Sequence, residues 1–466
     1  MSSEVITAEP VPLSGSWREL LRGRTGLLVV GLMLLEFATA MQYFAVAVVM
    51  PLVAHDLNAE RYYGWLIGSY GMAMIAAAPL TPGITARLGR LRAAGLASAV
   101  FIVGGLLAAV AGSVAVFVIG RVLQGFGSGV LATFGVSAVA HAIPERLRKH
   151  VYSLVSAVWL LPAFVGPVYA STVSSLLDWR WTLTLILPLV LVGRALVVRR
   201  AGMFAAEDTR TQTPPFIRVL ILIAGCLLVL VGTSVKSDVG QIAAVCGLVL
   251  VAVAARRLLP TGERGPRLAV LAMLTLTLGY SGLDAMATVI ARRGFESSIA
   301  QASAVLTCDA VTWSTVGFLQ AKFHERWHLS TGGAGVLGSL MVAVPVAALP
   351  VMLVAHLSSG TAMPLMWTVF LVSGAGMGFI YTNLPVTAVD VRDASTTDAF
   401  AAGLVLAESM GASLGSMIAG GLYSYGLQRG LSAPHSLALA VTALAASLIA
   451  TVFIAFAIRR QLRFKI

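Results

Sequence analysis

The sequence predicts an all-α integral membrane protein with about fourteen transmembrane helices. Three observations lead to this fold class: the composition, the length of the apolar segments and the distribution of the basic residues. Of the 466 residues, 58% are apolar and only 11% are charged, and the mean hydropathy is +0.89. A soluble chain carries about a quarter charged residues. Because the charges here are too few to cover the surfaces of soluble domains, we expect the outer surface to face lipid.

Long apolar segments follow one another along the chain. A membrane-spanning helix needs about 20 mostly apolar residues, whereas a membrane β-barrel would show alternating strands of about ten residues. The segments have the length of helices and are separated by Gly, Pro or charged residues. The expected helices lie at 26–50, 62–84, 93–112, 114–140, 151–176, 180–198, 217–235, 239–256, 268–290, 299–321, 333–356, 362–385, 398–424 and 434–458.

Basic residues are concentrated in alternate loops. With a cytoplasmic N-terminus, the cytoplasmic loops and tails carry roughly four times as many Lys and Arg residues as the opposite loops, as the positive-inside rule requires. An odd number of helices would destroy this bias, so fourteen is favoured, or twelve if two weak segments fail. We therefore expect a protein of the bacterial cytoplasmic (inner) membrane with both termini in the cytoplasm. The net charge of +12 comes from these small clusters, and no nucleic-acid partner is expected.

An internal repeat divides the chain into two halves. A Gly-x-Gly-x-Gly pattern lies at Gly125–Gly129 and again at Gly374–Gly378. Transporters are commonly built from such halves, with the substrate site between them near the middle of the membrane. The expected parts are a cytoplasmic N-terminal tail at 1–24, a six-helix bundle at 25–200, a cytoplasmic linker with two extra helices at 201–258, and a second six-helix bundle with a short cytoplasmic tail at 259–466.

Three motifs occur in order in the first half. They are Arg121-x-x-Gln124-Gly125-x-Gly127-x-Gly129 in the fourth segment, Pro162-Ala-Phe-Val-Gly166-Pro167 in the fifth, and Asp178-Trp179-Arg180-Trp181 at the start of the sixth. With these motifs the chain resembles, along nearly its whole length, the fourteen-helix drug–proton antiporters of the major facilitator superfamily. The resemblance implies the major facilitator fold with two extra central helices. It also implies multidrug efflux driven by the proton gradient, without a cofactor.

Two positions depart from the pattern of that family. The loop after the second helix usually reads G-x-x-x-D-R-x-G-R; here Arg87 and Arg90 are present, but Ala86 stands at the acidic position. In the first helix, Gln42 stands where an acidic residue is usual, nine residues before Pro51. The roles of those two carboxylates cannot be transferred, so coupling must use other acidic residues.

Ionisable residues inside the apolar segments are the candidates for proton coupling. They are Glu36, Arg121, Asp284, Asp309 and Glu408. A charge at the centre of the bilayer costs from about 3 to over 10 kcal/mol, and a carboxyl group avoids this cost by binding a proton. Asp284 is the main candidate, with Tyr280 one turn earlier as its hydrogen-bond partner and Glu408 as a second carrier. The alternative for each is a structural hydrogen bond to a neighbouring helix; Arg121 either neutralises a carboxylate or contacts backbone carbonyl groups.

Aromatic and amide side chains supply the candidate substrate cavity. They are Gln42, Trp159, Tyr280, Trp313, Tyr381 and Asn383. Aromatic faces attract organic cations, although aromatic residues in membrane helices also serve in packing and as interface anchors. Conformational gating is assigned to Arg87, Arg90, Gly125, Gly129, Gly166 and Pro167. Glycines four residues apart allow close helix contact and Pro weakens a helix, so tight packing or a passive kink is the alternative.

The leading function hypothesis is a proton-coupled secondary active exporter of amphipathic or cationic small molecules that works by alternating access. A dedicated exporter of a lipid or secondary metabolite on the same scaffold is the first alternative. A non-transporting membrane receptor or structural subunit is a further one, and an uptake symporter for a polar solute is another. No Walker loop, HExxH or GxSxG pattern is present, so neither an enzyme, an ATP-driven pump nor a metal site is expected. The expected partners are the small-molecule substrate, protons and membrane lipid, and the protein is expected to be a monomer.

Overall fold

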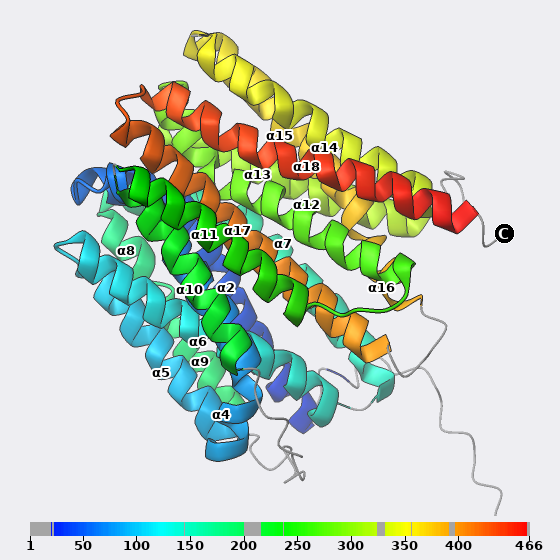
Figure 1. Ribbon diagram of the computed structural model, residues 1–466. Coiled ribbons are helices and arrows are strands. Elements are labelled where there is room, and N and C mark those ends of the chain that lie inside the picture. Colours follow the sequence, from blue (N-terminus) through cyan, green and yellow to red (C-terminus); the bar gives the residue numbers. More distant parts are fainter. Residues whose placement is uncertain are drawn as a thin grey trace, which may run out of the picture.

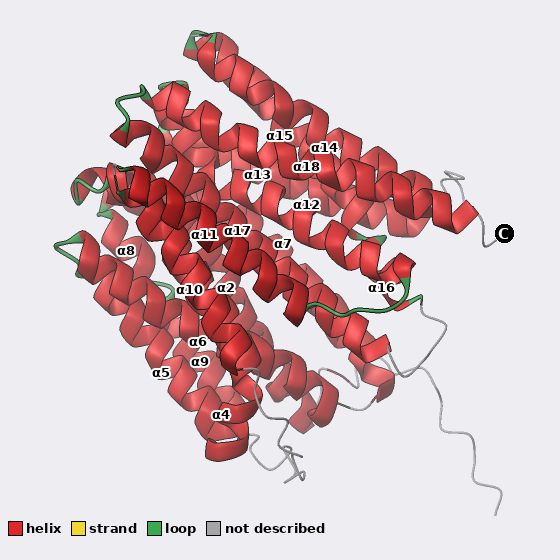
Figure 2. Ribbon diagram, in the orientation of Figure 1, coloured by secondary structure: helices red, strands yellow, loops and turns green. Residues whose placement is uncertain are grey.

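The computed structural model describes residue 20 and residues 23–143, 145–199, 216–235, 237–323, 331–355, 357–390 and 397–463. Within these ranges every regular element is helical (Figure 2). Twelve helices there are long and apolar enough to cross a membrane. The segment expected at 62–84 is not among the twelve. The structure divides it into a helix, a 3-10 turn that contains Pro79 and a second short helix that begins beside Pro82. The segment expected at 151–176 is helical but is not counted either, so the number fourteen stays a prediction.

The helices form two groups around one seam (Figure 1). The N half contains α2 (Gly23–Asp56), α3 (Tyr63–Ala77), α4 (Thr81–Leu88), α5 (Arg90–Ala109), α6 (Val114–Ala142), α7 (Glu145–Leu176), α8 (Trp179–Thr184) and α9 (Leu187–Val198). The C half contains α12 (Arg264–Val289) with a π-helical end (Ile290–Gly294), α13 (Ile299–Phe323), α14 (Thr331–Val354), α15 (Ser359–Tyr381), α16 (Leu384–Val389), α17 (Thr397–Gln428) and α18 (Ala433–Arg463). Between them in sequence stand α10 (Phe216–Ser234) and α11 (Asp238–Leu258).

The two glycine motifs pack in the same way in the two halves. A Cβ at Gly125 or Gly129 on α6 would meet the backbone carbonyl groups of Tyr70 or Met74 on α3. In the C half, a Cβ at Gly378 on α15 would lie 2.7 Å from the carbonyl oxygen of Trp313 on α13, and Gly374 stands against Asp309 one turn away. Only glycine permits such close helix contact. The repeat in the sequence therefore corresponds to a repeated helix pair in space.

The halves are held together at the end of the bundle where α2 and α12 terminate, which we call the closed end. An ion pair joins Glu60 to Arg293 across the seam. The backbone N–H of Gly64 on α3 donates to Ser424 Oγ on α17 at 3.3 Å. The rings of Tyr63 and Tyr423 meet edge to face, with centroids 5.5 Å apart. The terminal end, where α2 begins and α18 finishes, lies at the other side of the membrane-spanning layer.

The α10–α11 hairpin lies across this seam and contacts both halves. Trp65 Nε1 on α3 donates to Ser234 Oγ at 2.8 Å, and Gln428 Nε2 at the end of α17 donates to the carbonyl of Thr233 at 3.4 Å. A buried apolar cluster joins the hairpin to both helices, with Ile75 from α3, Cys226 from α10 and Met417 from α17 among its members. The extra helices therefore cover the joint between α3 and α17.

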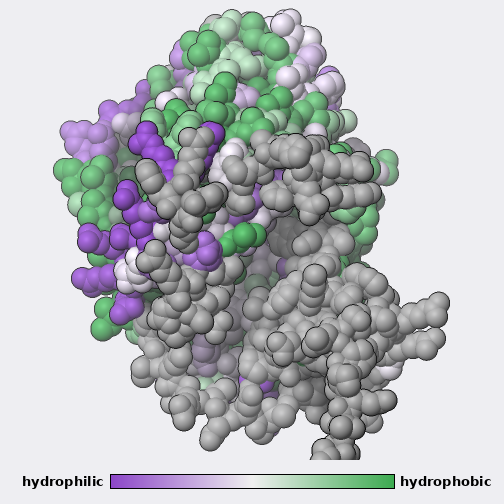
Figure 3. All heavy atoms as spheres, turned by 90° about the vertical axis from the view of Figure 1, so that its right-hand side faces the viewer, coloured by the Kyte–Doolittle hydropathy of each residue, from purple (hydrophilic) through white to green (hydrophobic). Residues whose placement is uncertain are grey.

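The lateral surface is strongly apolar. Large hydrophobic side chains stand exposed on the helices, for example Leu176 and Val239 at 75% and Phe453 at 70% exposure. Figure 3 views the end toward which the C-terminus points and shows hydrophilic side chains gathered there, bordered by hydrophobic side chains. Exposed apolar flanks with polar ends are what a bilayer requires of a helical bundle.

Candidate functional site

Two buried aspartates lie side by side on the first two helices of the C half. Asp284 on α12 is 8% exposed and Asp309 on α13 is 3% exposed, and the charge of Asp309 acts on Asp284. Within the described part of the chain, one oxygen of each carboxyl group, Oδ1, has no hydrogen-bond partner. Two carboxyl groups this close in an apolar surrounding cannot both ionise without a large cost. The pair is therefore suited to hold a proton or to attract a cation.

Tyr280 binds a different aspartate from the one expected. The sequence placed Tyr280 one turn before Asp284 and predicted a hydrogen bond between them; in the structure the Tyr280 hydroxyl donates to Asp309 Oδ2 on the neighbouring helix. Side chains of a helix lean toward its N-terminus, so the long Tyr280 side chain reaches away from Asp284. It thereby ties α12 to α13 at the carboxyl pair.

A line of aromatic rings continues from this pair toward a third carboxyl group. The Tyr280 and Trp313 rings meet edge to face at 6.0 Å between centroids, and Trp313 meets Tyr381 in the same manner at 5.5 Å. The Tyr381 hydroxyl donates to Glu408 Oε1 at 2.7 Å. Residues from α12, α13, α15 and α17 are thus joined in one row within the C half. Six residues proposed from the sequence lie in this row or at its end: Asp284, Asp309, Tyr280, Trp313, Tyr381 and Glu408.

One residue of the site comes from the N half and was missed from the sequence. The Tyr43 hydroxyl on α2 is hydrogen-bonded to Ser281 on α12, and the charges of Asp284 and Asp309 both act on it. The neighbouring Phe44 is buried against Ala310, which follows Asp309 on α13. A signal existed in the sequence, because Tyr43 directly follows Gln42, the position at which the family pattern has an acidic residue.

Arg121 and Glu36 lie on helices of the N half. Arg121 Nη1 donates to Gln124 Oε1 at 2.7 Å, and its guanidinium stands 4.3 Å above the centre of the Tyr70 ring. Its contacts are thus an amide and an aromatic ring within its own half, which differ from both contacts expected from the sequence. Glu36 lines a small hollow between α2 and α6 together with Thr39 and Phe134. These two residues are separate from the aromatic row.

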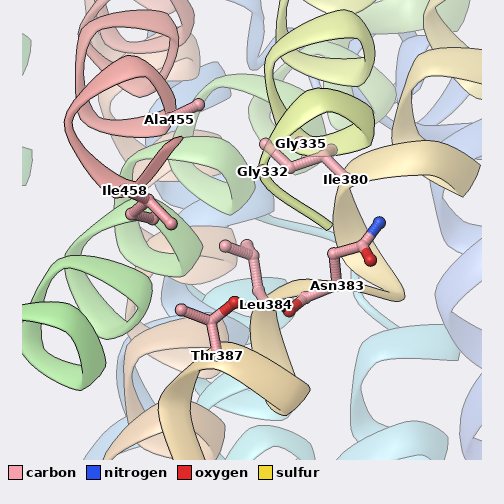
Figure 4. Close-up of a pocket in the computed structure, with 8 residues that line it drawn as sticks. All are labelled: Gly332, Gly335, Ile380, Asn383, Leu384, Thr387, Ala455 and Ile458. Carbon is pink, nitrogen blue, oxygen red and sulfur yellow. Dashed lines mark hydrogen bonds between the residues drawn. The ribbon is translucent and has the colours of Figure 1, made fainter. Parts of the chain in front are cut away.

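The remaining cavity candidates do not join the row. Gln42 is 1% exposed, and neither its amide nitrogen nor its oxygen has a partner in the described part of the chain. The side chain of Trp159 lies outside the described residues. Asn383 Nδ2 donates to the carbonyl of Phe379 at 2.6 Å. It lines a separate pocket between α14, the α15–α16 bend and α18 (Figure 4), formed by Gly332, Gly335, Ile380, Asn383, Leu384, Thr387, Ala455 and Ile458.

The gating candidates occupy two helix junctions. Arg87 is exposed in the last turn of α4, and Gly89, with φ of 77°, reverses the chain so that α5 can begin at Arg90. Gly166 lies in the interior of α7, and a Cβ there would approach Phe44 Cβ on α2 to 2.8 Å. Pro167 follows inside the same helix. Gly166 therefore allows α7 to pack closely on the helix that carries Tyr43.

Comparison with known proteins identifies the family. The pattern of the Major Facilitator Superfamily matches residues 32–416. The chain belongs to the major facilitator superfamily. The match confirms the family and the fold expected from the motifs.

Similar members of the superfamily include bacterial drug pumps. "Multidrug efflux pump SdrM" of Staphylococcus aureus (strain N315) is 22% identical over 445 residues, which cover 90% of this chain and 95% of that protein. "Probable multidrug-efflux transporter Rv1634" of Mycobacterium tuberculosis (strain ATCC 25618 / H37Rv) is 25% identical over 463 residues, covering 93% and 95%. Both similarities run along nearly the whole length of the two chains compared.

Solved structures share the fold at low sequence identity. A POT family transporter in complex with 5-aminolevulinic acid has a TM-score of 0.68 at 12% identity and covers 97% of this chain and 98% of its own. A bacterial homologue of the human lysosomal transporter Spinster, in an inward-facing and occupied conformation, has a TM-score of 0.63 at 15% identity, covering 96% and 98%. With its family and its apolar helices, the chain is an integral membrane transport protein that takes a small-molecule substrate.

Proposed function

We propose that this chain is a proton-coupled exporter of amphipathic, often cationic, small molecules that works by alternating access. The observation that carries the proposal is the buried carboxyl pair Asp284–Asp309 joined by aromatic rings to Glu408. The protein would lie in the bacterial cytoplasmic membrane with both termini in the cytoplasm. It would act without a cofactor, since the proton gradient supplies the energy.

Coupling follows from competition for one buried site. A carboxylate in an apolar surrounding is costly unless a positive partner compensates its charge. A proton and an organic cation can each compensate this charge, but once one of them is bound the carboxyl pair binds the other less strongly. Arrival of a cation from the terminal end therefore favours release of the proton, and protonation from the other side favours release of the cation.

The aromatic row extends the site toward Glu408. The rings of Trp313 and Tyr381 are only partly buried and offer their faces to a flat or cationic molecule. Glu408, held by the Tyr381 hydroxyl at 2.7 Å, is the third acidic group that such a molecule meets. The similar drug pumps support this reading of the substrate class.

Purified protein in liposomes tests the proposal. Ethidium and a panel of other drugs, lipids and polar solutes would be added while proton release and substrate accumulation are recorded. We expect proton release with the amphipathic cations. Release with one lipid or metabolite alone would support the dedicated exporter instead, and accumulation of a polar solute with the proton would support a symporter.

Asp284→Asn is the decisive variant. We expect it to abolish accumulation of ethidium against a gradient while leaving ethidium binding and downhill equilibration. Asp238→Asn is the matched control, because the Asp238 side chain is 95% exposed and the chemical change is the same. If Asp284→Asn still concentrates ethidium, Asp284 is not the proton carrier. The same measurement on Asp309→Asn and Glu408→Gln then assigns the role.

A further inference from the structure

Tyr43 is the polar side chain with which the N half approaches the carboxyl pair. Its hydroxyl is hydrogen-bonded to Ser281, which lies three residues before Asp284 on the same face of α12. Its ring meets the Phe44 ring edge to face at 5.3 Å between centroids, and Phe44 is buried against Ala310. One turn further along α2, the Ala47 carbonyl accepts a hydrogen bond from Thr288 Oγ1 of α12. This part of α2 is therefore wedged onto α12 and α13 beside the two aspartates.

We propose that Tyr43 is the positioning residue through which the charge of the Asp284–Asp309 pair controls the contact between the two halves. The proposal rests on the proposed function, in which this pair gains and loses a proton. It adds a residue of the opposite half and states how protonation is converted into opening of the closed end.

The physical reason is the strength of a hydrogen bond to a charged acceptor. Such a bond is roughly twice as strong as one between neutral groups. Oδ1 of Asp284 and Oδ1 of Asp309 have no partner in the described part of the chain, so the pair has acceptor capacity beside the hydroxyl groups. An ionised pair stabilises the Tyr43 O–H dipole, directly or through Ser281. A fully protonated pair stabilises it much less.

The interaction energy between Tyr43 and the ionised pair stabilises the contact between the halves, because Tyr43 belongs to the N half and the aspartates belong to the C half. It is present while α2 lies on α12 and α13, and it is lost when they separate. An ionised pair therefore favours the closed end as it stands here, and protonation weakens the contact and permits opening. The direction suits the proposed exporter, because an ionised pair then keeps the closed end shut until a cation or a proton compensates its charge.

The titratable groups beside Tyr43 on α12 and α13 can be named from the described part of the chain. On α12 they are Tyr280 and Asp284, and on α13 they are Cys308 and Asp309, whose charge acts on the Cys308 thiol. A pH effect between weakly acidic and weakly basic conditions is therefore assigned to the aspartates once Cys308 is replaced by Ser.

The test measures opening of the closed end without measuring transport. Ser424, 1% exposed on α17 beside Gly64, is replaced by Cys in a chain whose own Cys226, Cys246 and Cys308 are replaced by Ala, Ala and Ser. The rate of maleimide labelling is recorded in lipid nanodiscs at about pH 5 and about pH 9, either side of the carboxyl range. Each rate is divided by that of Asp238→Cys, an exposed position, to remove the pH dependence of the thiol itself.

With Tyr43 and Ser281 unchanged, we expect the normalised labelling rate at low pH to be about tenfold higher than the rate at high pH. Tyr43→Phe keeps the ring packing but should raise labelling at high pH and reduce the pH ratio to about one. Ser281→Ala should act in the same direction and replaces Tyr43→Phe should that variant fail to fold. Tyr169→Phe, which removes another N-half hydroxyl bonded to a carbonyl at 3.0 Å, should keep the full pH ratio.

An unchanged pH ratio in both Tyr43→Phe and Ser281→Ala would overturn the proposal. A pH ratio of one without any substitution at Tyr43 would overturn it as well. These outcomes are distinct from failure of the proposed function, which shows as no proton release from the unsubstituted protein in liposomes when ethidium or the other amphipathic cations are added.

Discussion

Gly64 lies where α3 of the N half touches the backbone of α17 in the C half. A Cβ at this position would stand 2.8 Å from the N atom and 2.9 Å from the Cα atom of Gly421, and 3.2 Å from the carbonyl carbon of Gly420. An ordinary contact begins at 3.4 Å, so the shortfall is 3.4 − 2.8 = 0.6 Å. The obstructing atoms are backbone atoms, which cannot rotate away. Gly64→Ala must therefore push the two helices apart.

The expected size of this effect is that of overpacking by one methyl group. Such insertions cost about 1–3 kcal/mol, which corresponds to roughly 5- to 150-fold in an equilibrium between two conformations. Because the strain acts between the halves, it is relieved when the closed end opens. We expect the population with an open seam to rise by this factor while the two bundles stay folded.

Labelling of the Ser424→Cys reporter measures the opening. The matched control is Gly112→Ala in the loop between α5 and α6, where a Cβ would meet nothing within 4 Å. The control should label at the unmodified rate, and Gly64→Ala should label several times faster. Equal rates for the two variants would refute the reasoning that this glycine holds the seam closed.

Two further substitutions test contacts described above. Tyr381→Phe keeps the ring on Trp313 but removes the bond to Glu408, so we expect the export rate of ethidium in liposomes to fall about threefold to tenfold. Tyr62→Phe, at an exposed position, should not change it, and an unaltered rate in Tyr381→Phe would remove Glu408 from the transport path. Trp65→Phe removes the bond to Ser234 of the α10–α11 hairpin, and we expect labelling at Ser424→Cys to rise about twofold to tenfold. Trp181→Phe, at an exposed position, is the control, and equal labelling in both would show that the hairpin does not hold the seam.

The α10–α11 hairpin is attached more closely to the C half than to the N half. Only residues 259–263 separate α11 from α12, whereas residues 199–215 separate α9 from α10. Besides the Gln428 bond, a Cβ at Gly421 on α17 would lie 2.8 Å from Thr233 Oγ1. The hairpin is therefore expected to move with the C half, so that opening of the seam breaks the contact with Trp65.

Much of this protein was determined by the sequence alone. Apolar length and charge bias are properties of single segments, because each membrane helix satisfies its own backbone hydrogen bonds. Membrane insertion, the helical class and the two-half plan could therefore be predicted without any contact between helices. The buried aspartates stood out for the same reason, since a charge such as that of Asp284 within an apolar segment needs an explanation whatever its neighbours are.

Which of those residues contact one another was decided by the tertiary structure. Asp309 follows Asp284 by 25 residues (309 − 284), and only the packing of α13 on α12 brings their side chains together. The same packing brings the Tyr280 hydroxyl to Asp309 instead of Asp284, and the packing of α6 on α3 in the N half places Arg121 over the Tyr70 ring. For Tyr43 the sequence held only the indirect signal of its place after Gln42, because a tyrosine in an apolar helix is ordinary until the opposite half is placed against it. Helix periodicity predicts which residues share one face of a helix, but it does not predict which neighbouring helix packs against that face. The chemistry of this site depends on that packing.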